Sequence, residues 1–149
     1  MAEFKNNPKN CDPLLLDNQL CFPLYVCARE VINAYTPFLD KIGLTYTQYI
    51  TMMVMWEEKQ VLTRRLRSRL RLDSGTLTPV IKRLEEKGFI TKERSSQDAR
   101  DLIVSITEKG EKLREEAIHI PEQMAVCVSG LTRGRELREI LLEVMDLFE

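Results

Sequence analysis

Apolar residues recur every three or four positions between residues 13 and 42, and this spacing predicts one long helix. The stripe consists of Leu16, Leu20, Leu24, Cys27, Val31, Tyr35 and Phe38. Asp12 and Pro13 suit the cap and first position of such a helix, while Pro23 and Pro37 each lack a backbone donor and should bend it. Other apolar residues fall off the stripe, so the helix needs more than one partner, which favours a dimer.

Three more helices are predicted over residues 46–58, 62–70 and 74–87. Gly43 ends the first helix and Thr45 can cap the second. Asp73 and Ser74 can cap the fourth, which Gly88 ends. The apolar run 52–56, with three methionines and a tryptophan, is expected to lie in the core.

The second half of the chain begins with a predicted hairpin. Residues 89–94 and 102–106 have the composition of strands, and the polar stretch 95–101 between them is typical of a turn. A helix from Thr107 to about Ile120 is predicted next, interrupted by Pro121. Apolar helical patterns follow at 124–129 and 137–148, joined across 130–134.

This order of elements predicts a mostly α-helical fold with a small β-hairpin, namely a winged helix-turn-helix with terminal dimerisation helices. The length of 149 residues favours a single domain. Residues 45–106 would form its DNA-binding part, and residues 13–42 and 108–148 its dimerisation helices. No apolar run approaches the ~20 residues of a membrane span, and residues 1–8 lack the apolar core of a signal peptide, so we expect a cytoplasmic protein.

The net charge of −1 conceals a polarised distribution. Residues 61–100 hold eleven Lys and Arg against five Asp and Glu, a net charge of +6, so the rest of the chain carries −7. A basic middle segment within an acidic frame suits a phosphate-binding face. A solvated helix face would have the same composition, and charge alone does not separate the two.

The start of the helix at 74–87 has the residues of a recognition helix. Ser74, Gly75, Thr76, Thr78 and Pro79 fill its first turn and a half, where short side chains allow close approach to base edges and phosphates. Lys82 and Arg83 follow one turn later and could bind the flanking backbone. The alternative is a capped core helix whose hydroxyls only satisfy backbone groups. The arginine-rich helix before it and the hairpin after it favour recognition.

The predicted hairpin carries Asp98 and Arg100 at its tip. The acid can hold the guanidinium in one geometry while the arginine enters a narrow minor groove. The alternative is a surface salt bridge worth ~0–1 kcal/mol. Following a recognition helix, the pair favours DNA contact.

The four cysteines and the single histidine do not suggest a metal site. Cys11, Cys21, Cys27 and Cys127 form no C-x-x-C pair, and His119 alone cannot complete a usual zinc set. We therefore predict no metal and no cofactor. In a reducing cytosol, any disulfide would be transient.

Cys21 is the candidate for redox chemistry, because Tyr35 and Tyr46 could donate hydrogen bonds to its sulfur and favour the reactive thiolate. Cys27 lies one and a half turns further along the helix, points elsewhere and is expected to belong to the core. Cys127, in the C-terminal helices, could trap an oxidised Cys21 as a disulfide. The alternative is that these cysteines are small buried hydrophobes, and spacing alone favours it.

Three stretches of the chain resemble the MarR superfamily of winged-helix repressors, in its organic-hydroperoxide-resistance branch. They are Asp17–Tyr25, Leu44–Tyr49 and Leu72–Pro79, and the hairpin Asp-x-Arg and the motif ending at Gly110 agree with them. The resemblance covers residues 14–148. The arginine-rich helix departs from it, with Arg67 where a small residue is common.

That resemblance implies that Cys21 is the peroxide-reactive cysteine, with Tyr35 and Tyr46 as its hydrogen-bonding partners. It also implies a disulfide from Cys21 to Cys127 of a second subunit, and a homodimer on a palindromic double-stranded DNA operator. The leading hypothesis is a repressor, not an enzyme, that releases its operator when an organic hydroperoxide oxidises Cys21. Its rivals are a MarR-like repressor released by a phenolic ligand, a thiol peroxidase, and an activator.

Overall fold

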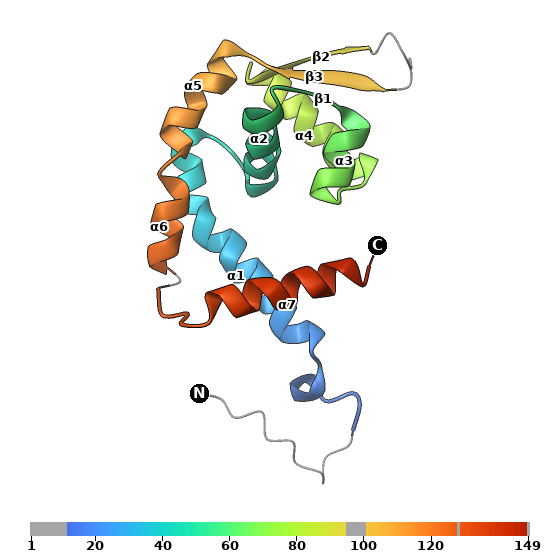
Figure 1. Cartoon of the computed structure of the whole chain (residues 1–149), viewed down its shortest axis with the longest axis vertical. Coiled ribbons are helices and arrows are strands. Elements are labelled where there is room, and N and C mark those ends of the chain that lie inside the picture. The colour runs from blue at the N-terminus through green and yellow to red at the C-terminus, as the bar shows by residue number, and fades with distance from the viewer. Residues whose placement is uncertain (1–11, 95–100, 128, 149) are drawn as a thin grey trace. The chain divides into compact units, whose positions relative to one another are not determined.

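The computed structural model describes residues 12–94, 101–127 and 129–148 (Figure 1). The chain divides into two compact units between Ala34 and Tyr35. From residue 12 onward, the first unit contains the 3-10 turn η1 (Leu16–Asn18) and most of helix α1 (Cys21–Leu39). The predicted helix start at Pro13 is therefore wrong. Asp12 instead organises a local turn, in which the backbone N–H of Leu14 donates to Asp12 Oδ1 at 2.9 Å.

Pro23 explains why α1 begins only at Cys21. It lies in the first turn of the helix, where its missing N–H removes no helical hydrogen bond. A helix starting earlier would need that N–H to donate to the carbonyl of Gln19, which the proline ring would also clash with. Pro23 therefore sets the start of the helix instead of bending it. Pro37 lies inside α1, two residues before the helix gives way to the 3-10 turn η2 (Asp40–Ile42).

The second unit contains the predicted helices and hairpin in the predicted order, together with a short strand that was not predicted (Figure 1). After η2 these are α2 (Tyr46–Glu58), β1 (Gln60–Leu62), α3 (Thr63–Leu70), α4 (Ser74–Glu86), β2 (Ile90–Arg94), β3 (Leu102–Ile106), α5 (Glu108–Ala117), α6 (Ile120–Cys127) and α7 (Gly134–Asp146). The mostly α-helical winged-helix prediction is confirmed. Within the described residues, no helix has both the length and the hydropathy that a membrane span needs.

Local capping chemistry fixes the helix ends of this unit where the sequence predicts them. Gly43 adopts a left-handed φ of 66° after η2, and Gly88 does the same at 74° after α4. Thr45 and Gln48 form a capping box, with Gln48 N donating to Thr45 Oγ1 at 3.4 Å and Thr45 N to Gln48 Oε1 at 3.3 Å. Asp73 caps α4 by accepting from the backbone of Thr76 at 2.9 Å.

The sheet has three antiparallel strands in the order β1-β3-β2. The hairpin of β2 and β3 is confirmed, with Thr91 opposite Ser105, although β2 starts at Ile90 and not at Phe89. The turn residues 95–100 lie outside the described residues. Strand β1 was not predicted, because its three residues are too short to show an alternating pattern.

The core of the second unit lies between α2, α3, α4 and the sheet. Its most deeply buried apolar side chains are Leu39, Met52, Met55, Leu66, Leu77, Leu84, Ile90 and Val104. The prediction that the whole run 52–56 is core is wrong for Met53, which is 46% exposed. Five consecutive residues surround a helix on all sides, so one of them must face outward.

The C-terminal helices break close to the predicted proline. Helix α5 ends at Ala117, and Pro121 is the second residue of α6, a position that tolerates its missing donor. Helix α7 starts three residues earlier than predicted and ends at Asp146. Its apolar residues remain exposed in the single chain: Leu137, Ile140, Leu141, Leu142 and Met145 are each at least 38% exposed. Such a face is typical of an interface between subunits.

Candidate functional site

Helix α4 presents a polar face to solvent and an apolar face to the core. Leu77, Ile81 and Leu84 are buried on one side. The predicted DNA-contacting residues of this helix are all exposed, namely Ser74, Gly75, Thr76, Thr78, Pro79, Lys82 and Arg83. An exposed N-terminal turn with hydroxyls and free N–H groups can approach a groove or a phosphate.

The first turn of α4 is held by its own capping residue. Thr76 donates its hydroxyl to Asp73 Oδ2 at 2.7 Å, in addition to its backbone bond. Hydrogen bonds from the Thr76 side chain and then its backbone lower the pKa of Asp73. A Cβ on Gly75 would lie 2.9 Å from Asp73 Oδ1, so this position favours glycine. The cap therefore fixes the end of the helix that would enter DNA.

Most arginines of α3 are engaged within the protein. Arg65 pairs with Glu58 at 2.6 Å, and Arg69 pairs with Glu58 at 2.5 Å and Glu57 at 2.8 Å. The hydrogen bonds from Arg65 and then Arg69 lower the pKa of Glu58. These two arginines hold α3 against the end of α2. In contrast, Arg67 is exposed and has no ion pair among the described residues, so it is the arginine of this helix best placed to meet a phosphate.

Asp101 joins the start of β3 to the start of α3 and was missed from the sequence. Its Oδ1 accepts from the Thr63 hydroxyl, from Leu102 N at 3.0 Å and from Arg64 N at 3.3 Å. Its Oδ2 is buried, accepts no hydrogen bond from the described residues, and lies 3.3 Å from Arg64 Nε. Leu62 occupies the N-cap position of α3, and its side chain forms no capping hydrogen bond. Asp101, the residue before β3, supplies the capping oxygen instead.

The protonation state of Asp101 reflects two opposing effects. Burial raises the pKa of its carboxyl. The hydrogen bond from Thr63, then those from the Arg64 and Leu102 backbones, outweigh burial and bring the pKa below the usual value. The carboxylate is therefore ionised at neutral pH, where it stabilises the start of β3, at the turn end of the hairpin. Asp98 and Arg100, the predicted tip residues, lie outside the described residues.

Four aromatic side chains form a row from the end of α1 along α2. The ring centroids of Tyr35 and Tyr46 are 5.1 Å apart, those of Tyr35 and Tyr49 are 6.0 Å apart, and Tyr49 meets Trp56 edge-on at 6.2 Å. The indole N–H of Trp56 donates to the carbonyl of Gly110 at 2.8 Å. The structure thus brings together the two predicted tyrosines. Tyr49 and Trp56 were missed, although their spacing of seven residues places them on one face of α2.

Burial governs the titration of two of these phenols. Desolvation, and then the neighbouring Tyr46, raise the pKa of Tyr35. Desolvation also raises the pKa of Tyr49. Tyr35 is therefore a neutral hydrogen-bond donor at physiological pH.

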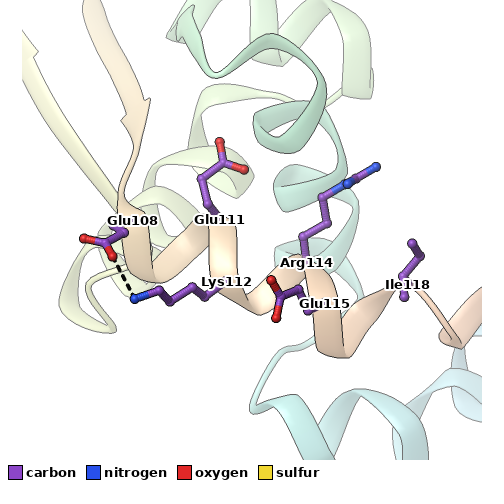
Figure 2. A pocket seen from close by; sticks show the side chains of 6 residues that line it. All are labelled: Glu108, Glu111, Lys112, Arg114, Glu115 and Ile118. Carbon is purple, nitrogen blue, oxygen red and sulfur yellow. Dashed lines mark ion pairs between the residues drawn. The ribbon is translucent and has the colours of Figure 1, made fainter.

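Hollows lie on the described part of the second unit, and two of them are lined by residues of α2, α5 and the start of α6. The larger hollow has a volume of about 450 Å³ and is lined by Glu108, Glu111, Lys112, Arg114, Glu115 and Ile118. Figure 2 shows these side chains along α5 and its C-cap. Glu108 and Lys112 form an ion pair at 2.7 Å. The smaller, of about 140 Å³, lies against α2 and is lined by Tyr49, Met53, Trp56, Arg114, Ala117, Ile118 and Pro121. We call the smaller one the aromatic groove. Its lining is mainly apolar and includes one arginine.

The three described cysteines are free thiols and exposed. Cys21 and Cys27 belong to the first unit, whereas Cys127 belongs to the second, together with Tyr35 and Tyr46. The prediction that Cys27 lies in the core is wrong for the single chain, because no residue of α1 before Leu39 is buried. Cys127 Sγ donates to the carbonyl of Gln123 at 3.6 Å. Cys11 lies outside the described residues.

Cys21 and Cys27 of one chain are too widely separated to bridge. Cys27 lies six positions after Cys21 on one helix, which corresponds to ~9 Å of rise and a rotation that leaves the two side chains about 120° apart around the helix axis. A disulfide needs a Cα–Cα distance of about 4.4–6.8 Å. Among the described residues, no three His, Cys, Asp or Glu side chains are grouped to hold a metal ion.

Comparison with known proteins agrees with this geometry. The family model for the transcriptional regulator SarA/Rot matches residues 33–117. The organic hydroperoxide resistance transcriptional regulator of Bacillus subtilis (strain 168) is 40% identical over 140 residues, which cover 93% of this chain and 92% of that protein.

Solved structures resemble the chain over a similar length. Reduced AbfR bound to DNA superimposes with a TM-score of 0.77 at 32% identity, covering 89% of this chain and 92% of that one. MarR shares the fold, with a TM-score of 0.69 at 22% identity over 85% of this chain and 94% of its own. With a relative 40% identical across nearly its whole length, the chain belongs to the MarR superfamily of winged-helix transcriptional regulators, in the organic-hydroperoxide-resistance branch.

Proposed function

We propose that this protein is a dimeric repressor that binds a palindromic operator while Cys21 is reduced and releases it when an organic hydroperoxide oxidises Cys21. The observation that carries the proposal is the pairing of Tyr35 and Tyr46 at 5.1 Å on the unit that presents the exposed face of α4. Two phenols in the same compact unit as the proposed DNA-binding helix are suited to a sensor that controls it. As a regulator of transcription, the protein would act in the cytoplasm.

DNA binding would use α4 as the recognition helix. Ser74, Gly75, Thr76, Thr78 and Pro79 would face the major groove, and Lys82 and Arg83 would bind the adjacent backbone. Asp98 and Arg100 would place the hairpin tip in the minor groove. The exposed position of the α4 residues and the anchoring of the start of β3 by Asp101 support this assignment.

The sensing step would occur at the Cys21 sulfur. Its thiolate attacks one oxygen of the hydroperoxide, the O–O bond breaks, and the departing alkoxide takes a proton and leaves as the alcohol. Cys21 is thereby oxidised to a sulfenic acid and the hydroperoxide is reduced. The hydroxyls of Tyr35 and Tyr46 would donate hydrogen bonds to the sulfur, a role that the raised pKa of Tyr35 supports because the phenol keeps its proton.

A second thiol would then complete the switch. Cys127 of the partner subunit attacks the Cys21 sulfenic sulfur, forming a disulfide and releasing water. The exposure of both cysteines supports this step. A crosslink between subunits would reorient two recognition helices whose half-sites lie ~34 Å apart, and a rigid spacing of that kind tolerates little rotation.

The aromatic groove supports an organic oxidant over hydrogen peroxide. Its lining by Tyr49, Met53 and Trp56 is mainly apolar, and Tyr49 lies next to Tyr35 in the aromatic row. An alkyl or aryl group would gain from leaving water there, whereas hydrogen peroxide has no such group to bury.

The test is operator binding before and after treatment with cumene hydroperoxide, measured by fluorescence anisotropy on the protein's own promoter DNA. We expect the wild-type protein to lose at least about a hundredfold in affinity, and Cys21→Ser to retain it. Cys27→Ser is the matched control, since Cys27 is an exposed thiol on the same helix. Release from Cys21→Ser on peroxide treatment would contradict the proposal.

A separate experiment tests the bridge. Non-reducing electrophoresis after oxidation should show a doubled mass for the wild-type protein and a single mass for Cys127→Ala. A doubled mass in the Cys127→Ala protein would exclude Cys127 as the resolving thiol.

The aromatic groove also favours one alternative, a repressor released by a phenolic ligand bound there. That mechanism predicts release that is insensitive to dithiothreitol and unchanged in Cys21→Ser. The thiol-peroxidase alternative predicts repeated turnover with a thiol reductant. The relatives of this chain are transcriptional regulators, which favours stoichiometric oxidation.

A further inference from the structure

Lys87, at the C-terminal end of α4, is bonded to a segment about forty residues earlier in the chain. Its ammonium donates to the carbonyl of Gly43 at 2.6 Å and to Gln48 Oε1 at 2.8 Å. Gly43 ends the turn after α1, and Gln48 lies in the first turn of α2. The Lys87 side chain therefore connects the segment between α1 and α2 to the C-terminal end of the recognition helix.

The two acceptors hold the segment that positions the tyrosine pair. Gln48 is 5% exposed and closes the capping box with Thr45. Tyr46 is the first residue of α2, directly after that cap, and its ring lies 5.1 Å from Tyr35. Because the capping box fixes the first turn of α2, a displacement of Tyr46 must move the acceptors of Lys87 with it.

The opposite end of the connection is the recognition helix. Lys87 is the C-cap of α4, and its backbone N–H donates to the carbonyl of Arg83 at 3.1 Å. The thirteen residues of α4 span ~20 Å, with Leu77, Ile81 and Leu84 buried along one side. A packed helix moves as a stiff element instead of stretching, so a shift at Lys87 is transmitted along α4 to its first turn at Ser74.

Other lysines near this end of α4 lack such a connection. Lys82 lies 3.9 Å from Glu86 of the same helix, and both side chains are exposed. Lys109 donates to the backbone carbonyl of Lys87 at 2.7 Å and packs on Phe89, but neither partner belongs to α2. Lys87 is thus the lysine whose charge is held between the tyrosine-bearing segment and the recognition helix.

We propose that Lys87 is a positioning residue that makes the recognition helix follow the tyrosine pair, so that a change in tyrosine contacts on oxidation reaches the operator. This inference rests on the proposed function. It adds a residue that touches neither the oxidant nor the DNA, yet determines how strongly oxidation and operator binding are coupled.

The main test compares the operator Kd of oxidised and reduced protein in Lys87→Met, which keeps the apolar stem and loses the ammonium. We expect the reduced variant to bind within about threefold of wild type with an unchanged salt slope, and Cys21 to form sulfenic acid at the wild-type rate. The ratio of oxidised to reduced Kd should fall at least about tenfold. Lys109→Met, the matched control, should keep the wild-type ratio, and Lys87→Arg should restore most of it.

A double-mutant cycle tests the same connection without any oxidant. Tyr46→Ala should weaken operator binding of the reduced protein in the wild-type background, and clearly less in the Lys87→Met background. If circular dichroism shows that Lys87→Met does not fold, Lys87→Gln replaces it, because the glutamine side chain is too short for its amide to reach both acceptors of Lys87.

The outcomes separate the two proposals. If wild-type protein does not release DNA on oxidation, the proposed function fails, and the cycle still decides whether Lys87 couples Tyr46 to the operator. If wild type releases and Lys87→Met releases equally, with additive effects in the cycle, the inference about Lys87 is overturned while the proposed function stands.

Discussion

Replacing Asp101 by Asn should remove a charge that holds the start of β3 to the start of α3. Its Oδ1 accepts from three donors, the Thr63 hydroxyl and the backbones of Arg64 and Leu102. A hydrogen bond to a charged group contributes about 1.5–3 kcal/mol, against about 0.5–1.5 kcal/mol for a neutral one, so three bonds lose about 3 kcal/mol in total. The new amide would also direct a donor at Arg64, whose Nε lies 3.3 Å from Oδ2.

The effect should depend on pH with a definite sign. The pKa of Asp101 is lowered in the folded protein, so its ionisation stabilises the fold above the unfolded pKa of about 3.9. That contribution is lost as the pH falls through the lowered folded-state pKa. The deficit of Asp101→Asn should therefore be constant from pH 5 to 8 and shrink only below about pH 4.

Guanidinium unfolding at a fixed protein concentration measures this loss, since the stability of a dimer depends on concentration. The midpoint should fall without a change in slope. Glu108→Gln is the control, because Glu108 pairs with Lys112 on an exposed helix face, where such pairs contribute only ~0.3–0.5 kcal/mol. An Asp101→Asn protein as stable as Glu108→Gln would refute the assignment of Asp101 as the cap of α3.

Three further outcomes are expected. Gly110→Ala would place a methyl carbon 2.2 Å from the backbone oxygen of Phe89. The free energy of unfolding should therefore fall by about 3 kcal/mol, and Tm in a thermal melt by about 10 °C. An unchanged Tm would contradict this packing. Burial raises the pKa of Tyr35 and of Tyr49. The stability that the neutral phenols contribute is therefore complete below pH 10, and it is lost as the pH rises through the raised pKa values of the folded protein. Absorbance at 295 nm should therefore show a late component from Tyr35 and Tyr49 that appears together with unfolding, and the absence of that component would argue against their burial. Arg67→Ala should lower the salt slope of operator binding by about one, whereas Arg65→Ala, which breaks an internal pair, should leave that slope unchanged.

Local chemistry made the helix ends of the DNA-binding part predictable. Thr45 and Asp73 cap residues within three positions of themselves, and Gly43 and Gly88 end helices by their own backbone conformation. Each of these features depends on a few neighbouring residues. The exposed face of α4 followed in the same way from the spacing of its apolar residues.

Features that depend on distant partners were not predictable. Asp101 caps a helix whose first residue lies 38 positions earlier, and no local pattern marks it. The charge of α3 suggested phosphate binding, but Arg65 and Arg69 bind carboxylates at the end of α2. Lys87 is one more surface lysine in the sequence, and only the fold brings it to Gly43.

Trp56 is the only tryptophan in the chain, and it borders the aromatic groove with its indole N–H fixed to the backbone of Gly110. Its emission therefore reports on one known place, with no dye and no sequence change required. Excitation energy absorbed by Tyr49, whose ring centroid lies 6.2 Å from that of Trp56, should be transferred to the indole and emitted as tryptophan fluorescence. The protein thus contains its own spectroscopic marker for events at the groove, readable in real time on unlabelled material.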